Sequence, residues 1–181
     1  MNNQINKRLK FIVYTSLSIA MVALATMAIK IPSVKGGYVN FGDIVIFITA
    51  VFLGKTAGFF AGGIGSAMAD LILGYTVYAP ATFVIKGLEG FICGYLSGGK
   101  SKAEIKTGPL ILAIVVSAAW MIFGYFMFEC KIGSLLFANE DFGLTAAVLN
   151  LPGNIIQGAV SAAAALPFIL SLKKTGISFK I

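Results

Sequence analysis

Three ionisable side chains interrupt the apolar segments of this chain. Asp70 lies near the end of one apolar run, and Lys86 and Glu89 lie three positions apart in the next, which places them on one face of a helix. A charge inside a bilayer costs a few kcal/mol, so we expect Asp70 to face inward and meet Lys86 or Glu89. Such a group could join two helices as an ion pair, bind a ligand or carry protons, and the residues alone leave these alternatives open.

The residues that most enzymatic and metal chemistry needs are missing. The chain has no histidine, and Cys93 and Cys130 show no metal-binding or redox spacing, which removes His-based nucleophile pairs and the usual zinc and copper sites. The tripeptide from Gly54 to Thr56 resembles the end of a phosphate-binding loop, but that motif requires glycine where this chain has Thr49. We therefore predict no enzyme, no metal and no cofactor, and energy from nucleotide hydrolysis would have to come from other subunits.

Polar and aromatic side chains gather on one side of the expected bundle. In the last apolar segment, polar residues from Asn150 to Ser161 follow spacings of four, three and four, which is one helical face. Amides in lipid need partners, so this face points inward. Two connecting segments add rings and polar groups, and the alternatives are a small-molecule site, which we favour, or hydrogen bonds between helices. The members of this group are Tyr38, Asn40, Asp43, Tyr75, Tyr78, Asn150 and Asn154.

Small or polar residues recur every four positions through one apolar run. They are Gly58, Gly62, Ser66, Asp70 and Gly74. Small side chains at this spacing let two helix backbones approach closely in lipid. The stripe predicts a tightly packed membrane bundle with a polar position inside it.

Composition indicates an all-α membrane protein. The chain has 181 residues, of which 58% are hydrophobic and 12% charged, and its mean hydropathy is +0.92, whereas a soluble domain carries about 25% charged residues. We predict a single transmembrane domain over residues 1–181. The net charge of +7 comes from basic residues at the ends of apolar runs, with no basic stripe between aromatics, so nucleic acid is not expected as a partner.

The apolar runs predict about six transmembrane helices, with both termini cytoplasmic. With the N-terminus inside, ten of the 14 basic residues fall on inner segments and three on outer ones, and basic residues favour the cytoplasmic side. A span needs about 20 residues, so the second run is short. Between the first two runs, Pro32 and the Gly36–Gly37 pair exclude one continuous helix, so this loop faces water or folds back into the bundle. The runs cover residues 9–29, 42–54, 56–74, 80–98, 108–130 and 145–172.

A smooth face marks the cytoplasmic half of the first predicted helix. Ser16, Ala20 and Ala23 follow one another at four and three positions. Such a face either accepts a helix of another protein or packs within the chain, and both alternatives stay open on the residues alone.

The segment from Ile31 to Gly94 resembles a known family. It contains IPSVKGGYVNFGDIVIFITAVFLG, then KTAGFFAGGIGSAMADLILGY, then YAPATFVIKGLEGFICGYL. With about six spans and a folded first loop, the chain is similar to the substrate-binding S components of energy-coupling factor (ECF) vitamin transporters. The match is to the riboflavin-type subgroup, whose members include candidates for pyridoxine or for hydroxymethylpyrimidine, a thiamine precursor.

The resemblance implies a subunit of the prokaryotic cell membrane that captures a vitamin near the outer face without catalysis. Such a subunit docks through its first helix on a transmembrane coupling subunit that carries two ATPases, and then topples in the bilayer. The family has Ala-x-x-x-Ala there, and this chain has Ser16-x-x-x-Ala20. The positions that match the family's pocket are Tyr38, Asn40, Asp43, Tyr75, Tyr78, Lys86, Glu89, Asn150 and Asn154.

Two further considerations bear on the function. The single tryptophan, Trp120, favours a small ring such as pyridoxine or hydroxymethylpyrimidine, with riboflavin next. The main alternative is a stand-alone secondary transporter that uses Asp70, Lys86 and Glu89 as an ion relay. An intramembrane enzyme or assembly factor is third, and the missing histidine argues against the enzyme.

Overall fold

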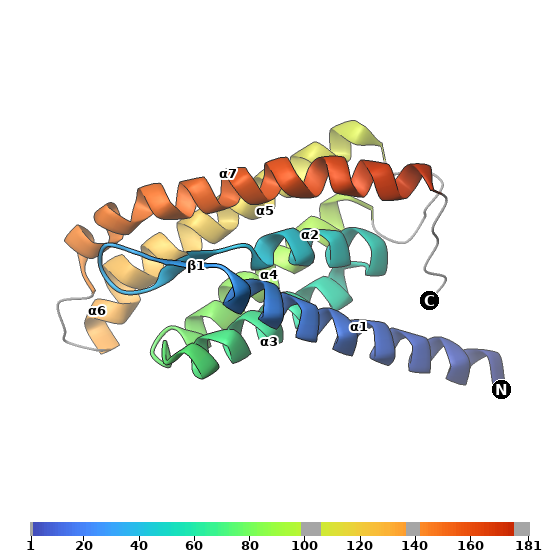
Figure 1. The fold of residues 1–181 in the computed structure, drawn as a ribbon, viewed down its shortest axis with the longest axis horizontal. Helices are drawn as coiled ribbons and strands as arrows, with labels where there is room; N and C mark the ends of the chain where they lie inside the picture. Colours follow the sequence, from blue (N-terminus) through green and yellow to red (C-terminus); the bar gives the residue numbers. More distant parts are fainter. Residues whose placement is uncertain (1, 99–105, 137–141, 176–181) are drawn as a thin grey trace.

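Apolar helices account for almost all of the computed structural model, which describes residues 2–98, 106–136 and 142–175. The short η2 (Phe128–Ile132) is a π-helical turn that continues α5 (Thr107–Met127), as the ribbon shows (Figure 1). In chain order the elements are α1 (Asn2–Ala28), β1 (Lys30–Pro32), β2 (Tyr38–Asn40), α2 (Gly42–Leu53), α3 (Lys55–Leu73), α4 (Ala79–Leu96), α5 (Thr107–Met127), η2 (Phe128–Ile132), α6 (Gly133–Leu136) and α7 (Leu144–Lys174).

The helical membrane bundle that the composition predicts is confirmed. Four helical stretches are long and apolar enough to cross a membrane: Gln4–Ala28, Lys55–Leu73, Thr107–Ile132 and Leu144–Lys174. The second predicted span is the short α2 of 12 residues. The fourth is α4, whose 18 residues include two charged side chains that are buried.

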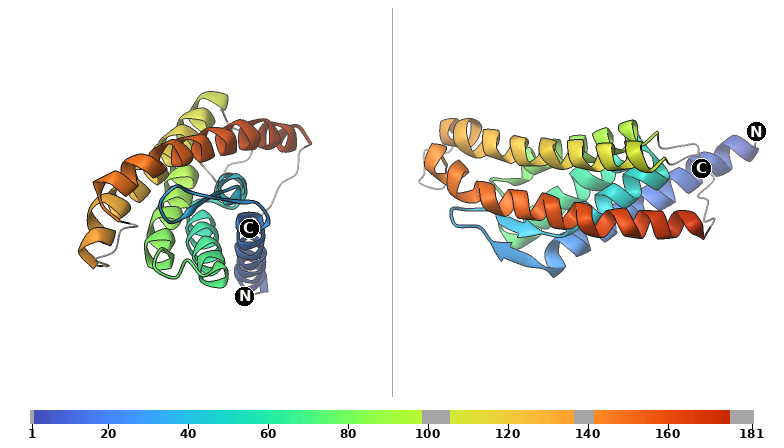
Figure 2. Two further views of the ribbon diagram at one scale, coloured as in Figure 1. Left: turned by 60° about the vertical axis from the view of Figure 1, so that its left-hand side comes forward. Right: turned by 90° about the horizontal axis from the view of Figure 1, so that it is seen from above.

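The first residues of α1 and the last of α7 lie at the same end of the bundle (Figures 1 and 2). This is the arrangement that an even number of crossings requires. Lys100, Lys102 and Lys180, which the charge argument counts as cytoplasmic, lie outside the described residues.

Helices α3 and α4 approach each other backbone to backbone. A Cβ atom placed on Gly58 would lie 2.6 Å from the carbonyl oxygen of Gly90, and one on Gly62 would overlap the carbonyl oxygen of Lys86. The predicted stripe of small residues therefore does permit close helix packing. Gly74 differs from the others, because it adopts φ +85° and ends α3 as a left-handed cap, with nothing within 4 Å of an added Cβ.

The segment between α1 and α2 is a short hairpin folded over the bundle. β1 and β2 pair antiparallel with Ile31 opposite Val39. The N–H of Lys35 donates to Asn150 Oδ1 at 3.0 Å, and the N–H of Asn40 donates to Gln157 Oε1 at 2.9 Å. The sequence leaves open whether this loop faces water or folds back into the bundle, and the structure shows that it folds back. Side-chain amides of α7 accept hydrogen bonds from its backbone N–H groups.

Helix α5 is joined to α4 through the single tryptophan. The indole Nε1 of Trp120 donates to the carbonyl oxygen of Ile85 at 3.1 Å. Gly124, one turn further along α5, leaves room for the Ile85 side chain, because an added Cβ would lie 3.0 Å from it. These contacts fix α5 against the part of α4 that carries Lys86.

Candidate functional site

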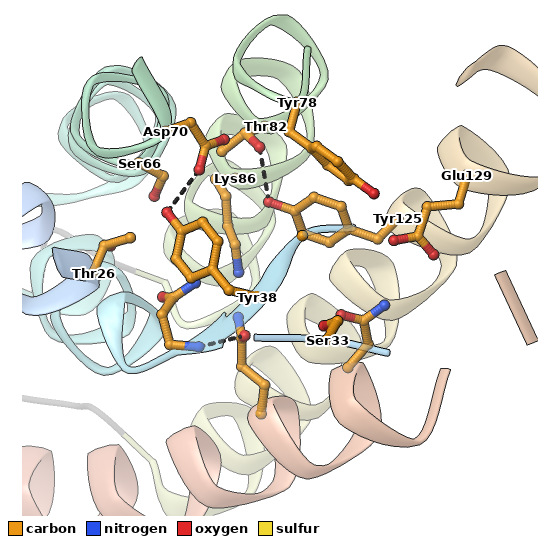
Figure 3. A pocket seen from close by; sticks show the side chains of 14 residues that line it. Thr26, Ser33, Tyr38, Ser66, Asp70, Tyr78, Thr82, Lys86, Tyr125 and Glu129 are labelled. Carbon is orange, nitrogen blue, oxygen red and sulfur yellow. Dashed lines mark hydrogen bonds between the residues drawn. The ribbon is translucent and has the colours of Figure 1, made fainter. Parts of the chain in front are cut away.

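A cavity of about 440 Å³, counting its opening to solvent, lies beneath the hairpin and between the helices (Figure 3). Hydroxyl, amide and charged side chains make up most of its lining, with three tyrosine rings among them. The residues that line it are Thr26, Ser33, Gly37, Tyr38, Asn40, Ser66, Asp70, Tyr78, Thr82, Lys86, Tyr125, Glu129, Asn154 and Gln157.

Five of the nine predicted substrate-binding residues line this cavity. They are Tyr38 and Asn40 from the hairpin, Tyr78 and Lys86 at and within α4, and Asn154 from α7. Residues far apart in the chain therefore meet at one place. The close-up shows Tyr38, Tyr78 and Lys86 around a common space (Figure 3).

The other four predicted residues lie one contact away from the cavity. Asp43 and Glu89 are fully buried and face Lys86. The ring of Tyr75 contacts that of Tyr38, with centroids 4.6 Å apart. Asn150 binds the hairpin and Glu129, so these four residues support the lining residues and are not part of the lining themselves.

A buried ion cluster joins α2 to α4. The ammonium of Lys86 is paired with Asp43 Oδ1 and lies 3.0 Å from Glu89 Oε2. Gln157 Nε2 donates to the second oxygen of Asp43 at 2.9 Å. The ammonium also lies 5.7 Å from the centre of the Tyr125 ring, which is within the range of a cation–π contact.

The expected pairing of Asp70 with Lys86 or Glu89 is wrong. Among the described residues no ion pair involves Asp70, and its Oδ1 accepts a hydrogen bond of 2.7 Å from the hydroxyl of Tyr38. The reason is tertiary: Lys86 faces Asp43 at the start of α2, whereas the hairpin brings Tyr38 to Asp70. Helix spacing along one segment carries no information on either contact.

Tyr38 acts as a protonated donor toward Asp70. Burial, and then the neighbouring Asp70 carboxylate, raise the pKa of Tyr38 well above its ordinary value. The hydroxyl therefore keeps its proton at neutral pH and donates it to the carboxylate.

Several buried polar atoms of the cavity lack a protein partner. Thr26 Oγ1, Asp70 Oδ2 and Asn154 Nδ2 have no hydrogen-bond partner among the described residues. An unpaired buried donor or acceptor costs about 1–3 kcal/mol. A ligand with complementary groups would recover that free energy, so the cavity is suited to a polar ligand.

Sequence reasoning missed several lining residues. Asp70 and Ser66 lie on the predicted small-residue stripe, and Gln157 on the predicted amide face, so a signal for each was present. Glu129 is a carboxylate at the end of an apolar run, which is also a signal. The remaining missed residues are uncharged and isolated in sequence: Thr26, Ser33, Gly37, Thr82 and Tyr125.

The π-helical turn of η2 carries Glu129 at the edge of the cavity. Its Oε1 accepts a hydrogen bond of 3.0 Å from Asn150 Nδ2. Single π turns inside α-helices occur frequently at functional sites. The apolar pattern of this segment predicts a helix but not its π-helical turn.

The arrangement can bind and orient a small polar ring. Over residues 2–98, 106–136 and 142–175, no group of three or more His, Cys, Asp or Glu side chains is arranged to hold a metal ion. The tyrosine rings offer stacking surfaces, and the amides and carboxylates offer hydrogen bonds of fixed direction.

The predicted docking face of α1 is only partly exposed. Ser16 and Ala20 are exposed, whereas Ala23 is 6% exposed and lies inside the bundle. The three residues therefore do not form one exposed surface: α1 packs against α2 and α3, and of the three only Ala23 lies on the side that these helices cover.

One protein family and two relatives match this chain. The family described as "ECF-type riboflavin transporter, S component" matches residues 6–174. A protein of Pyrococcus woesei, named "Uncharacterized protein in gap 3'region", is 45% identical over 105 residues, which cover 58% of this chain and 68% of that protein. The "Thiamine precursor transporter HmpT" of Lactococcus lactis subsp. cremoris (strain MG1363) is 28% identical over 177 residues, which cover 97% of this chain and 93% of HmpT.

Proposed function

The chain belongs to the S components of ECF-type riboflavin transporters, and from this premise we propose that the cavity beneath the hairpin captures a small aromatic vitamin or vitamin precursor. Members of this family are substrate-binding subunits of ECF vitamin transporters and multi-pass proteins of prokaryotic membranes, so the chain is a transporter subunit and not an enzyme. The observation that carries the proposal is the polar cavity with its unpartnered buried atoms.

Hydroxymethylpyrimidine or pyridoxine is our first candidate for the ligand, and riboflavin is the next. The relative that spans nearly the whole chain is named a thiamine precursor transporter. Trp120 is the single tryptophan of the chain and does not line the cavity, so no indole is available there to stack on a large flavin ring.

The partners we propose are a transmembrane coupling subunit and the two ATPases bound to it. Ser16 and Ala20 expose a small-residue face just past the middle of α1, and such faces let a second helix approach closely in lipid. Lipid covers the rest of the exposed apolar surface, which includes Leu17, Leu24 and Phe123.

The first experiment is to identify what the purified protein carries. The full chain is purified in detergent and denatured, and the released small molecules are measured by mass spectrometry. We expect hydroxymethylpyrimidine or pyridoxine, and nanomolar binding of that compound to ligand-free protein by calorimetry. Protein that carries and binds none of the three vitamins would contradict the proposal.

Uptake measurements separate the proposal from its alternative. In cells that contain the chain and a coupling module, we expect uptake to stop when the ATPases are inactivated. Uptake that continues without ATPases but stops when an ionophore collapses the ion gradient would support a stand-alone ion-coupled transporter instead.

A further inference from the structure

We propose that Asp70 selects ligands whose ring presents N–H donors, such as the amidine-like edge of an aminopyrimidine, and that the cavity rejects rings with a carbonyl oxygen at that edge. This inference rests on the proposed function, because it names the chemistry that the same cavity recognises. It concerns a residue that is not among the nine predicted substrate-binding residues.

Asp70 lies at the cavity wall, and only one of its two carboxylate oxygens accepts a hydrogen bond. The side chain is 4% exposed and points toward the space that Tyr38 and Thr82 also face (Figure 3). Tyr38 donates to Oδ1 at 2.7 Å, while Oδ2 has no hydrogen-bond partner among the described residues. A buried carboxylate oxygen in this position is stabilised by any donor that a ligand brings.

Two of the other three carboxylates near the cavity have a cation as partner. Asp43 and Glu89 share the ammonium of Lys86, whereas Glu129 accepts from Asn150 through Oε1 only. The cation that lines the cavity is therefore committed to two carboxylates. Asp70 has no such counterion within the described residues, so charge complementarity favours a ligand with a positive or donor-rich edge.

The hydrogen bond from Tyr38 prepares Asp70 for a two-point contact. A carboxylate oxygen has two lone pairs, so Oδ1 can accept from Tyr38 and from a ligand at the same time. An amino group beside a ring nitrogen that carries a proton offers two parallel N–H donors, as a guanidinium does toward a carboxylate. Tyr38 is thus a positioning residue, and Asp70 is the residue that contacts the ligand.

A donor on the other side of the cavity adds direction to the contact. Asn154 is 8% exposed and its Nδ2 has no hydrogen-bond partner among the described residues. Asn154 comes from α7 and Asp70 from α3, and both line the same cavity. A ring with donors on one edge and a hydroxyl or ring-nitrogen acceptor on another satisfies both atoms, whereas a ring with a carbonyl toward Asp70 leaves two acceptors facing each other.

The test compares two ligands that differ at one group. Calorimetry on the full chain in detergent measures binding of hydroxymethylpyrimidine and of its oxo analogue, in which a ring carbonyl replaces the amino group. We expect the amino compound to bind wild type about 100-fold tighter, since a site built to accept a donor rejects the analogue that lacks it. In Asp70→Asn the amide oxygen can still accept from Tyr38, while its NH₂ now donates into the cavity, so the preference for the amino compound should shrink to less than about 3-fold or reverse.

Ser161→Ala is the control, because Ser161 is buried in the bundle but does not line the cavity. It should leave the ratio of the two affinities within about 3-fold of wild type. If Asp70→Asn does not fold, Tyr38→Phe replaces it. That variant removes the donor that orients Asp70, and it should reduce the ratio by about 10-fold, in line with one lost hydrogen bond to a charged group.

The outcomes separate this inference from the proposed function. If wild type binds hydroxymethylpyrimidine and Asp70→Asn keeps the wild-type ratio, the inference fails and the proposed function stands. The same holds if wild type binds pyridoxine or riboflavin tightly but not the aminopyrimidine. If wild type binds none of these compounds, the proposed function fails and the inference fails with it.

Discussion

Gly58 and Gly90 place the backbones of α3 and α4 in direct contact: a Cβ on Gly58 would lie 2.6 Å from the carbonyl oxygen of Gly90. This contact sets the distance between the helix that carries Asp70 and the helix that carries Lys86. The two residues are glycine because no side chain fits between the helices there, and the position of the cavity depends on that fit.

Gly90→Ala should therefore destabilise the bundle. The new methyl group would overlap the backbone of Gly58, and overpacking of this kind costs about 1–3 kcal/mol. Thermal unfolding of the detergent-solubilised protein should show a lower midpoint than wild type. The matched control is Gly108→Ala, which has nothing within 4 Å of the added Cβ and should leave the midpoint nearly unchanged. Equal midpoints for Gly90→Ala and wild type would show that α3 and α4 are less closely packed than described.

Removing the ammonium of Lys86 should be more harmful than removing the whole ion cluster. Lys86→Met leaves Asp43 and Glu89 buried without their cation, which costs about 3–5 kcal/mol. A triple variant that adds Asp43→Asn and Glu89→Gln has no buried charge left in the cluster, and it should recover most of the thermal midpoint. A triple variant as unstable as Lys86→Met would mean that shape and not charge decides stability at this place.

The same triple variant distinguishes a structural cluster from an ion relay. If the cluster only supports the cavity, the folded triple variant should retain ATP-dependent uptake of whatever ligand it still binds. Complete loss of uptake with unchanged ligand affinity would indicate that these groups move protons or ions during transport.

Larger side chains on the exposed small-residue face of α1 should block ATP-dependent uptake without weakening ligand binding. Ser16→Leu or Ala20→Leu changes an exposed side chain outside the cavity, so ligand affinity measured by calorimetry should stay within about 2-fold of wild type, as expected for a surface change away from the site. ATP-dependent uptake should fall to background, because the coupling subunit can no longer approach the helix.

Met21→Phe serves as the control for that face. Met21 is exposed and lies about 100° around the helix from Ala20. Its enlargement should leave uptake intact. If ligand binding falls as far as uptake in Ser16→Leu, the face is structural and not a docking surface.

Asn150→Ala should shorten the time that a ligand stays bound. Asn150 accepts from the N–H of Lys35, donates to the carbonyl oxygen of Lys35 and donates to Glu129, so it ties the hairpin to α7 without lining the cavity. Each lost bond contributes about 0.5–1.5 kcal/mol, and we expect the dissociation rate to rise at least about 10-fold in stopped-flow or filter-binding measurements.

Ser161→Ala is the comparison for Asn150→Ala. Ser161 is buried on the same face of α7, and its Oγ has no hydrogen-bond partner among the described residues. Its removal should leave the dissociation rate unchanged. Equal dissociation rates for Asn150→Ala and wild type would show that the hairpin holds its place without this residue.

The helices themselves could be predicted from the sequence because each coincides with a continuous run of apolar residues. Every predicted apolar run contains one observed helix, and the short second run is the short α2. The small residues from Gly58 to Ser66 predict close packing of two helices because of their size alone. Gly74 has the spacing of the stripe but does not pack against another helix. It adopts a left-handed conformation and caps the end of α3.

The contacts inside the site could be predicted less well, because they depend on which loop reaches which helix. The spacing of the amides predicts the polar face of α7 but not its binding to the backbone of the hairpin. The spacing of Lys86 and Glu89 predicts their contact on one helix. The contact of Lys86 with Asp43 depends on how α2 packs on α4, and that of Tyr38 with Asp70 on how the hairpin folds over the bundle. The three isolated residues Thr26, Thr82 and Tyr125 carry no sequence signal that separates them from ordinary helix positions.

The indole of Trp120 gives the protein an intrinsic optical reporter. It is the only tryptophan in the chain, and its N–H donates a hydrogen bond to the carbonyl oxygen of Ile85, the residue before Lys86. A ligand that shifts α4 changes the hydrogen bond and the surroundings of this one fluorophore. Emission from the unlabelled chain would therefore follow occupancy of the cavity in real time, in detergent or in a lipid vesicle.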